Sequence, residues 1–339
     1  MLILMNADAT PAMIKRVCEE VVDLGLTPHP IKGLQRTVIN VTGNKYQVNA
    51  DRILTLDGVH DIVIITKPYK LVSRESHPED SHIDIGAGVI IGGPEFVVMA
   101  GPCSVESREQ CFKIAEYVAK KGARVFRGGA FKPRTSPYSF QGLGEEGLKI
   151  LAEVREKFGL LIVTEAVDTE TLDMVGDYTD IIQIGARNMQ NYSLLRKAGR
   201  TNKPILIKRG MSASLDEFLM AAEYVMVEGN PRVILCERGV RTFSNHNRNV
   251  LDLSAVTYVK KFSHLPIIAD PSHGSGQKYK VVPLSRASLA AGADGLLVEV
   301  HHEPEKALSD GPQAITLTDF ENLMSDVKKI AVAIGRTCK

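Results

Sequence analysis

Residues 94–129, PEFVVMAGPCSVESREQCFKIAEYVAKKGARVFRGG, contain the pattern that decides the fold. An apolar run at residues 96–100 is followed by an amphipathic stretch rich in Glu and Lys, and then by a second apolar run at residues 124–126. Short, continuous apolar runs are typical of parallel strands buried on both faces, and an amphipathic stretch between two of them is typical of a crossover helix. The segment therefore predicts a strand, a helix and a second, parallel strand.

The same pattern recurs through the rest of the chain. Eight apolar runs, with centres about 20 to 37 residues apart, lie at residues 96–100, 124–126, 160–164, 181–185, 204–207, 233–236, 266–269 and 295–298. Eight strand–helix units over about 245 residues is the size of a (β/α)8 TIM barrel. We therefore predict an α/β fold in which residues 95–339 form the barrel, with its last helix at residues 318–334.

An open, doubly wound sheet is the alternative fold, and it normally contains a glycine-rich motif that binds a dinucleotide. The nearest candidate is Gly86 and Gly88, but Ile91 stands where the third glycine belongs, and the sequence contains no Walker A motif. The stretches IDIG and VIIGG that flank these glycines predict a small β-hairpin instead.

The first 66 residues follow a different order: strand, helix, strand, strand, helix, strand. Predicted strands lie at residues 2–5, 27–31, 37–41 and 59–66, and predicted helices at residues 11–25 and 49–56. This order fits a ferredoxin-like βαββαβ domain. A polar stretch with Pro68 and Pro78 follows and is typical of a connector. We predict three parts, which are a small domain at residues 1–68, a connector with the hairpin at residues 69–94, and the barrel at residues 95–339.

Composition and net charge argue against a nucleic-acid-binding or membrane protein. The 339 residues include 41 Lys and Arg against 40 Asp and Glu, so no overall field attracts nucleic acid or an anionic membrane. No apolar run reaches the roughly 18 residues that span a bilayer. The five cysteines form no CxxC pair, and the start MLILMNADAT is unlike a signal peptide. We therefore expect a cytoplasmic protein with no nucleic-acid or membrane partner.

The residues that end the predicted strands are the most informative ones, because the active site of a TIM barrel lies at the C-terminal ends of its strands. Almost every predicted strand ends on an ionisable residue. The set comprises Cys103, Arg127, Lys132, Arg134, Glu165, Arg187, Lys208, Arg209, Glu237, Arg238, Asp270, His273 and Glu299.

The cations among them form the first of two groups, Arg127, Lys132, Arg134, Arg187, Lys208, Arg209 and Arg238. So many like charges at one rim need a multiply anionic partner, and Arg and Lys are the usual ligands of phosphate and carboxylate oxygens. We expect one or two phosphorylated carboxylate or sugar substrates. The alternative for any single arginine is a structural ion pair with Glu165, Glu237 or a helix acid.

The second group is Cys103, His273, Glu299 and Asp310. A thiolate, an imidazole and two carboxylates suit Mn²⁺, Fe²⁺, Co²⁺ or Zn²⁺, and the ligand types alone do not choose among these ions. Taken singly, Cys103 is more often a packing residue than a ligand. Its convergence with the others on one barrel mouth favours a divalent metal site.

Seven stretches together resemble 3-deoxy-D-arabino-heptulosonate 7-phosphate (DAHP) synthases of type I-beta. They are AGPCSVES at 100–107, RGGAFKPRTSPYSFQGLG at 127–144, QIGARNMQN at 183–191, LIKRGM at 206–211, ILCERGVRTF at 234–243, DPSHGSG at 270–276 and EVHHEPEKALSDGPQ at 299–313. The resemblance covers the barrel, and the N-terminal part resembles the ferredoxin-like regulatory domain of some family members. It implies a transferase that condenses phosphoenolpyruvate with D-erythrose 4-phosphate and water, the first step of the shikimate pathway to aromatic amino acids.

The resemblance also implies roles for individual residues. Lys132, Cys103 and His273 would be catalytic, and the metal ligands would be Cys103, His273, Glu299 and Asp310. Phosphoenolpyruvate would be bound by Arg127, Lys132, Glu165, Arg187, Lys208 and Arg238. Erythrose 4-phosphate would be bound by Lys132, Pro133, Arg134, Thr135 and Asn188.

Two alternative functions remain open at this point. A 3-deoxy-D-manno-octulosonate 8-phosphate synthase would use a five-carbon phosphosugar, but KPRTSPYSFQGLG at 132–144 favours erythrose 4-phosphate. A non-catalytic phosphosugar-binding protein would have no need for all four metal ligands. For the small domain, the resemblance implies an ACT-like module that binds tyrosine or phenylalanine as feedback inhibitor. The alternative is a purely structural role in subunit assembly. For the whole chain, the resemblance implies a homotetramer.

Overall fold

The chain divides into two compact units in the computed structural model, which describes residues 1–33, 36–43, 51–63, 68–134 and 136–339. The smaller unit comprises residues 1–79 with 262–264, and the larger unit comprises residues 80–261 with 265–339. The predicted hairpin belongs to the larger unit. The boundaries at residues 68 and 94 that we expect from the sequence stay a prediction.

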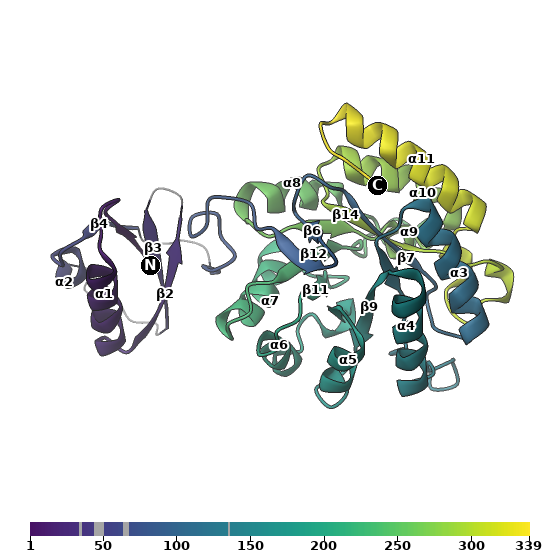
Figure 1. The fold of residues 1–339 in the computed structure, drawn as a ribbon, viewed down its shortest axis with the longest axis horizontal. Coiled ribbons are helices and arrows are strands. Elements are labelled where there is room, and N and C mark those ends of the chain that lie inside the picture. The colour runs from purple at the N-terminus through teal and green to yellow at the C-terminus, as the bar shows by residue number, and fades with distance from the viewer. Residues whose placement is uncertain (34–35, 44–50, 64–67, 135) are drawn as a thin grey trace. The chain divides into compact units, whose positions relative to one another are not determined.

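The larger unit is a closed barrel of eight parallel strands surrounded by helices (Figure 1). Its strands are β7 (Val97–Gly101), β8 (Val125–Arg127), β9 (Leu161–Ala166), β10 (Ile181–Ile184), β11 (Ile205–Lys208), β12 (Val233–Glu237), β13 (Ile267–Ala269) and β14 (Gly295–Glu299). Each strand pairs with the next in the chain, and β14 pairs with β7. The predicted TIM barrel is confirmed, and the open-sheet alternative is wrong.

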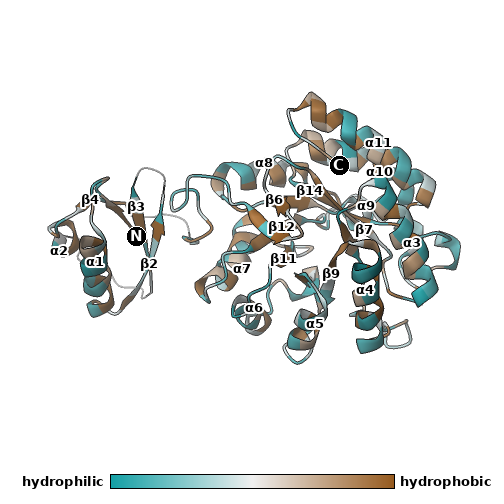
Figure 2. Cartoon of the chain, in the orientation of Figure 1, coloured by the Kyte–Doolittle hydropathy of each residue, from teal (hydrophilic) through white to brown (hydrophobic). Residues whose placement is uncertain are grey.

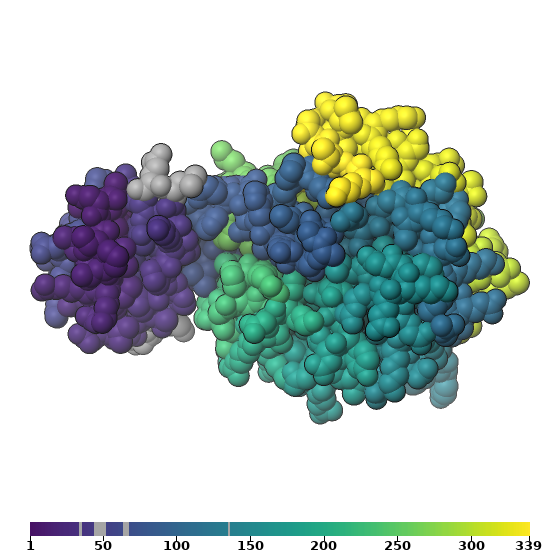
Figure 3. All heavy atoms as spheres, in the orientation of Figure 1, coloured from purple at the N-terminus to yellow at the C-terminus, as the bar shows by residue number. Residues whose placement is uncertain are grey.

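The main helices between the strands are α3 (Arg108–Lys121), α4 (Glu145–Phe158), α5 (Leu172–Tyr178), α6 (Tyr192–Gly199), α7 (Leu215–Val227), α8 (Leu253–Phe262), α10 (Lys278–Ala290) and α11 (Leu317–Ala333). Their ends follow ordinary capping chemistry. The Ser107 hydroxyl accepts a hydrogen bond from the Gln110 N–H at the start of α3, and Gly122 ends that helix at φ 105°. Helix α11 packs beside α3 and α10, so the last helix of the chain completes the outer ring next to the first (Figure 3).

The N-terminal end of the barrel is plugged by the hairpin of β5 (Ile83–Gly86) and β6 (Val89–Ile91). Four buried hairpin side chains, Ile83, Ile85, Val89 and Ile91, belong to one apolar cluster with barrel residues such as Met99 and Leu206. The same cluster contains the fully buried Cys236. Figure 2 shows the apolar strands inside a ring of helices whose outer faces are hydrophilic. The opposite end of the barrel, where the strands terminate, is therefore the end that can receive a ligand.

Short connections at that end include α9 (Pro271–Ser275) and the 3-10 turns η1 (Ala186–Asn188), η2 (Pro304–Lys306) and η3 (Gly311–Gln313). They carry several of the predicted site residues.

The smaller unit is an antiparallel sheet with strand order β2-β3-β1-β4 and two helices. Its elements are β1 (Leu2–Met5), α1 (Pro11–Asp23), β2 (Leu26–Lys32), β3 (Thr37–Gly43), α2 (Asp51–Leu54) and β4 (Val59–Val63). Thr10 caps α1 and Pro11 occupies its first turn, as expected from the sequence. The ferredoxin-like prediction is confirmed. Residues 49–50 of the predicted second helix and 64–66 of the predicted last strand lie outside the described residues.

Within the described ranges, no helix has the length and apolar character needed to cross a membrane.

Candidate active site

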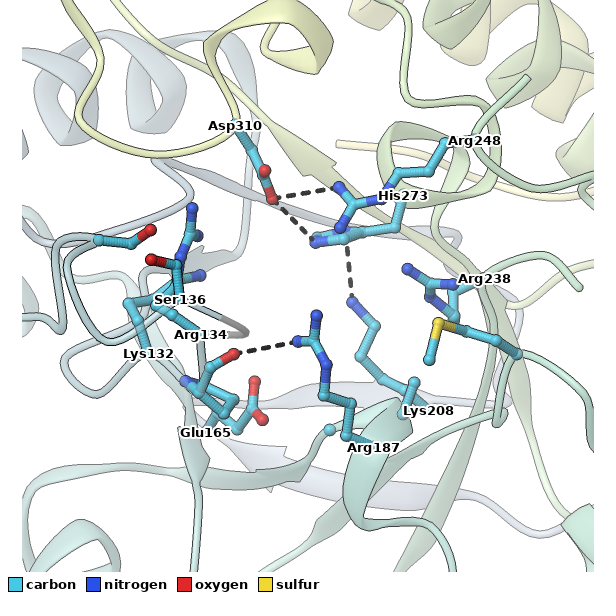
Figure 4. Close-up of a pocket in the computed structure, with 15 residues that line it drawn as sticks. Lys132, Arg134, Ser136, Glu165, Arg187, Lys208, Arg238, Arg248, His273 and Asp310 are labelled. Carbon is cyan, nitrogen blue, oxygen red and sulfur yellow. Dashed lines mark hydrogen bonds and ion pairs between the residues drawn. The ribbon is translucent and has the colours of Figure 1, made fainter. Parts of the chain in front are cut away.

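A cavity of about 300 Å³ opens at the C-terminal ends of the barrel strands (Figure 4). Nine of the residues singled out in the sequence line it: Lys132, Pro133, Arg134, Glu165, Arg187, Lys208, Arg238, His273 and Asp310. Figure 4 shows the arginine and lysine side chains reaching into one space from several strand ends. Cys103 and Glu299 are buried beside the lining residues Lys132 and His273, and Arg127 donates to Glu299.

Arg238 is the strongest sign of an anionic ligand. It follows β12 directly, and its side chain lines the cavity although the residue is only 4% exposed. Its Nε and Nη1 atoms have no hydrogen-bond partner among the described residues. Burial lowers the pKa of this guanidinium, with the nearby Asp270 acting in the opposite direction. A buried cation with unused donors is costly unless an anion fills the space beside it.

Lys132 lies between the cavity and Cys103, one of the predicted metal ligands. Its Nζ atom lies 3.1 Å from both the carbonyl oxygen and the Sγ atom of Cys103. Burial acts to lower the pKa of Lys132, but Cys103, Glu299 and Glu165 act together in the opposite direction and leave that pKa raised. A Cβ atom on Gly129 would lie 2.7 Å from Lys132 Cδ, so glycine is needed there for the lysine to take this path.

Cys103, Glu299 and Asp310 form a group whose ligand atoms all lie within 4.8 Å of one another. His273 adjoins it, with Nε2 3.4 Å from Glu299 Oε1 and 3.9 Å from Asp310 Oδ2. Asp310 itself has left-handed backbone angles, φ 50° and ψ 30°, which are uncommon for a residue other than glycine. Arg127 Nη1 donates to Glu299 Oε1 at 3.1 Å and fixes that carboxylate from the other side.

Asp270 orients the histidine. One oxygen of its carboxylate accepts the His273 backbone N–H at 2.9 Å as the N-cap of α9, and the other lies 2.8 Å from His273 Nδ1. Lys208 donates to the same carboxylate. Burial would raise the pKa of Asp270, but His273 and Lys208 hold it well below its usual value. A proton on Nδ1 facing this carboxylate leaves Nε2 as the lone-pair nitrogen, turned toward Glu299 and Asp310.

The protonation states suit a metal site. Burial lowers the pKa of His273, which favours the neutral imidazole that binds metals. Burial would raise the pKa of Asp310, but His273 and Arg248 lower it to about 2. Burial and Glu299 raise the pKa of the Cys103 thiol to about 11, so the thiolate form requires a strong positive charge beside it. One sulfur, one nitrogen and two carboxylates fit a borderline divalent ion.

Two predicted residues, Asn188 and Arg209, are placed differently from the rest. Asn188 does not line the cavity; its side chain donates to the Val167 carbonyl at 2.8 Å and accepts from Asn191. Arg209, grouped with the cations in the sequence, donates to Glu237 at 2.9 Å and to Asp252 at 3.0 Å. Arg209 therefore forms structural ion pairs, which is the alternative given above for any single arginine. Thr135 lies outside the described residues.

The remaining predicted residues have clear partners. Gln183 donates to Glu165 at 3.1 Å, and Arg187 Nη1 donates to the Pro133 carbonyl at 3.1 Å. Arg134 donates to the hydroxyl of Ser309 at 2.6 Å.

Among the site residues that sequence reasoning missed, three contact the candidate metal ligands directly. Arg248 lines the cavity from the loop after β12 and lies 3.4 Å from Asp310 Oδ2. Ser309 Oγ lies 3.1 Å from Cys103 Sγ, and Gln313 donates to Glu299 at 2.6 Å. Ser309 and Gln313 lie in the stretch 299–313 that resembles the family, so that stretch could have indicated them. Arg248 does not directly follow a predicted strand, and its positive charge in a long loop is the one signal the sequence offers.

Comparison with known families gives two matches that cover most of the chain. The DAHP synthetase I family matches residues 74–335, and the DAHP synthase ferredoxin-like domain matches residues 1–67.

Individual relatives agree with the family matches. A Thermotoga maritima phospho-2-dehydro-3-deoxyheptonate aldolase is 51% identical over 335 residues, which are 99% of each chain. The crystal structure of a Thermotoga maritima protein of that name has a TM-score of 0.80 and covers 100% of this chain and 99% of its own. A truncated Thermotoga maritima 3-deoxy-D-arabino-heptulosonate 7-phosphate synthase covers 80% of this chain and 99% of its own, with 50% identity and a TM-score of 0.75.

A more distant relative, a 2-dehydro-3-deoxyphosphooctonate aldolase of Koribacter versatilis, is 34% identical over 267 residues, 73% of this chain and 95% of its own. Since a relative with 51% identity spans nearly the whole chain and the family matches cover both units, we conclude that this chain is an enzyme of the DAHP synthetase I family with that family's ferredoxin-like domain at its N-terminus.

Proposed function

We propose that the chain condenses phosphoenolpyruvate with D-erythrose 4-phosphate and water to give DAHP and inorganic phosphate. The observation that carries the proposal is the buried Arg238, whose unused donors line a cationic cavity beside the Cys103, Glu299 and Asp310 group. Such a cavity suits a small substrate with several negative charges. The 51% identity to a DAHP synthase relative supports this choice of substrates.

For phosphoenolpyruvate we propose the ligands Arg127, Lys132, Glu165, Arg187, Lys208 and Arg238. Their support is position, because all except the deeper Arg127 line the cavity. Arginine and lysine donors arranged around the phosphate and carboxylate would hold the enol in one orientation. For erythrose 4-phosphate we propose Lys132, Pro133, Arg134 and Thr135. Asn188 has the least support, since its amide has other partners.

Holding both substrates converts a two-body encounter into an oriented attack of C3 of phosphoenolpyruvate on the aldehyde carbon. In this step the carbon–carbon bond forms and the aldehyde oxygen becomes an alkoxide. Lys132, as a protonated ammonium between the two subsites, would donate the proton that this alkoxide needs. Water then adds to C2; one of its protons would replace the proton that Lys132 gave to the alkoxide, and the other would leave with phosphate as the C2–O bond to phosphate breaks. The arginines that hold the phosphate would stabilise its charge as it departs.

The metal site is proposed to consist of Cys103, His273, Glu299 and Asp310. A divalent cation bound there would act as a Lewis acid toward the aldehyde oxygen or the attacking water. Asp270 would keep the His273 ring in its binding tautomer, and Arg127 would keep Glu299 in place.

We further propose that the ferredoxin-like domain binds tyrosine or phenylalanine and inhibits the reaction. Its support is the match of residues 1–67 to the DAHP synthase ferredoxin-like domain. The homotetramer implied by the resemblance stays a prediction.

The reaction can be tested by the loss of phosphoenolpyruvate absorbance. We expect the absorbance to fall with erythrose 4-phosphate, to stop falling after chelator treatment and to fall again after Mn²⁺ is added back. Arabinose 5-phosphate in a parallel cuvette distinguishes the octulosonate activity. Turnover with only the five-carbon sugar would overturn the proposal, and no turnover with either sugar would favour a binding protein.

Cys103→Ala and His273→Ala each remove one proposed metal ligand. We expect Mn²⁺-dependent turnover to drop at least about 100-fold in each variant, because losing a ligand should cost no less than losing its supporting partner. The thermal unfolding midpoint of the metal-free protein should change little. Wild-type activity in either purified, metal-loaded variant would show that the ligand assignment is wrong.

Arg134→Ala separates the two anion subsites. Losing a charged hydrogen bond to the sugar phosphate should raise the KM for erythrose 4-phosphate about 10- to 100-fold, which corresponds to about 1.5–3 kcal/mol. The KM for phosphoenolpyruvate should change much less, and steady-state kinetics with each substrate varied in turn measures both. The reverse pattern would mean that the two subsites are exchanged.

Deletion of residues 1–68 tests regulation. A truncated relative that covers 80% of this chain has a solved structure, so we expect the barrel to fold without residues 1–68. We expect the shortened chain to retain turnover and to lose inhibition by tyrosine and phenylalanine, as measured by initial rates with each amino acid. Inhibition equal to that of the full chain would place the effector site outside the deleted domain.

A further inference from the structure

Gln313 is a buried side chain in contact with both carboxylates of the proposed metal site. It is 2% exposed and ends the 3-10 turn η3. Its Nε2 atom donates to Glu299 Oε2 at 2.6 Å and to Asp310 Oδ2 at 3.4 Å. Its Oε1 atom accepts from Arg248 Nη1 at 3.0 Å. One neutral amide thus links two acids and one cation.

The orientation of this amide follows from the chemistry of its neighbours. Arg248 can only donate hydrogen bonds, so the amide oxygen must face it. Glu299 and Asp310 are ionised acceptors, so the NH₂ group must face them. The reversed amide would set its oxygen against a carboxylate and its NH₂ against a guanidinium. Arg248 therefore fixes the direction in which Gln313 donates.

The two carboxylates need such a donor. Glu299 and Asp310 are both acidic, and their ligand atoms lie within 4.8 Å of each other and of Cys103, so their negative charges repel. A neutral donor offsets part of that repulsion without adding a positive charge that would compete with a metal ion. The Arg127 guanidinium already occupies Glu299 Oε1, so Gln313 supplies the donor for the second oxygen.

Gln313 also holds Asp310 through the backbone. Its N–H donates to the Asp310 carbonyl oxygen at 3.1 Å and closes the turn in which Asp310 keeps its left-handed angles. Side chain and backbone act on the same residue, so the distance between the two carboxylates depends on Gln313.

We propose that Gln313 is a positioning residue that sets the spacing of Glu299 and Asp310 for a divalent ion, with its amide oriented by Arg248. The proposal rests on the metal site of the proposed function. It makes no use of Gln313 as a ligand, because the amide oxygen faces Arg248.

The test compares metal binding by the full chain and by Gln313→Met, which keeps the side-chain length and removes both polar ends. Equilibrium dialysis of chelator-treated protein with Mn²⁺ gives the affinity, and the visible absorption of the Co²⁺ form reports the ligand geometry. We expect Mn²⁺ to bind about 10- to 100-fold more weakly in the variant, the usual effect of losing such a supporting group, and the Co²⁺ spectrum to change.

Gln183→Met is the matched control. Gln183 is similarly buried at 5% exposure, but its amide donates to Glu165 and touches neither carboxylate of the metal group. Its Mn²⁺ affinity should equal that of the wild type. A control that weakens Mn²⁺ as much as Gln313→Met would mean that the loss comes from general loosening of the barrel, which overturns the proposal.

Arg248→Met tests the orienting role. The Arg248 side chain is 40% exposed, so this variant should fold even if Gln313→Met does not. We expect Arg248→Met to weaken Mn²⁺ binding several-fold. In a Gln313→Met background the same change should weaken Mn²⁺ binding much less, and the remaining effect would come from the direct contact between Arg248 and Asp310. An unchanged affinity in Arg248→Met, or full additivity in the double variant, would remove Arg248 from the proposal.

The outcomes separate the two proposals. If the wild-type chain binds no Mn²⁺, or binds it equally well without the Cys103 thiol, the metal site itself is wrong. If the wild type binds Mn²⁺ through Cys103 and Gln313→Met matches it in both affinity and Co²⁺ spectrum, the site stands and the positioning role is overturned.

Discussion

The pairing of β14 with β7 is the interaction on which the rest of the structure depends. Five register pairs, from Gly295 opposite Val97 to Glu299 opposite Gly101, join the last strand of the barrel to the first. This closure brings Glu299 and the loop that follows it to Cys103, although Cys103 and Asp310 are 207 positions apart. An open sheet would leave these residues on two distant edges. The β5–β6 hairpin fills the other end of the barrel, so a ligand can enter only at the end where the strands terminate. Strand closure thus determines which residues meet in the site, and the hairpin determines from which end they are reached.

Charge pairing between strand ends explains how so many ionisable residues coexist there. Arg127 pairs with Glu299, Lys208 with Asp270 and Arg209 with Glu237, and each of these six residues is buried. Each pair joins residues from different strand ends, and the Arg127–Glu299 pair also depends on the closure, because it joins β8 to β14. A buried pair contributes little net stability because both charges lose their hydration, but removing one partner is costly. Arg238 lines the cavity with two buried nitrogen atoms that have no hydrogen-bond partner among the described residues, which favours an anionic ligand.

The sequence predicts the strand ends well because barrel geometry maps each of them to the same rim. Cys103, His273, Glu299 and Asp310 could be grouped on that basis before any coordinates. Side-chain direction is harder to predict, since Asn188 and Arg209 stand at strand ends but bond to other partners. Loop residues are the hardest. Arg248 reaches Asp310 across 62 positions, and only the tertiary fold determines that meeting.

In the proposed function, the candidate metal ligands and the cations that line the cavity would suit a sugar phosphate of either length, so we infer that the loop between β8 and α4 distinguishes the two sugars. That loop is held by its own residues. The Lys132 N–H donates to the Gln141 carbonyl at 2.9 Å, and the Gln141 amide donates to the Ser139 carbonyl at 2.9 Å and to that of Pro137 at 3.3 Å. Gly142, at φ 96°, has no room for a Cβ atom because the Ala130 carbonyl oxygen would lie 2.1 Å away. The described part of this loop is thus held by its own glutamine and by a position that only glycine fits. In the proposed function, this loop would select one sugar, and the same cavity cations and candidate metal ligands would serve a related reaction on another.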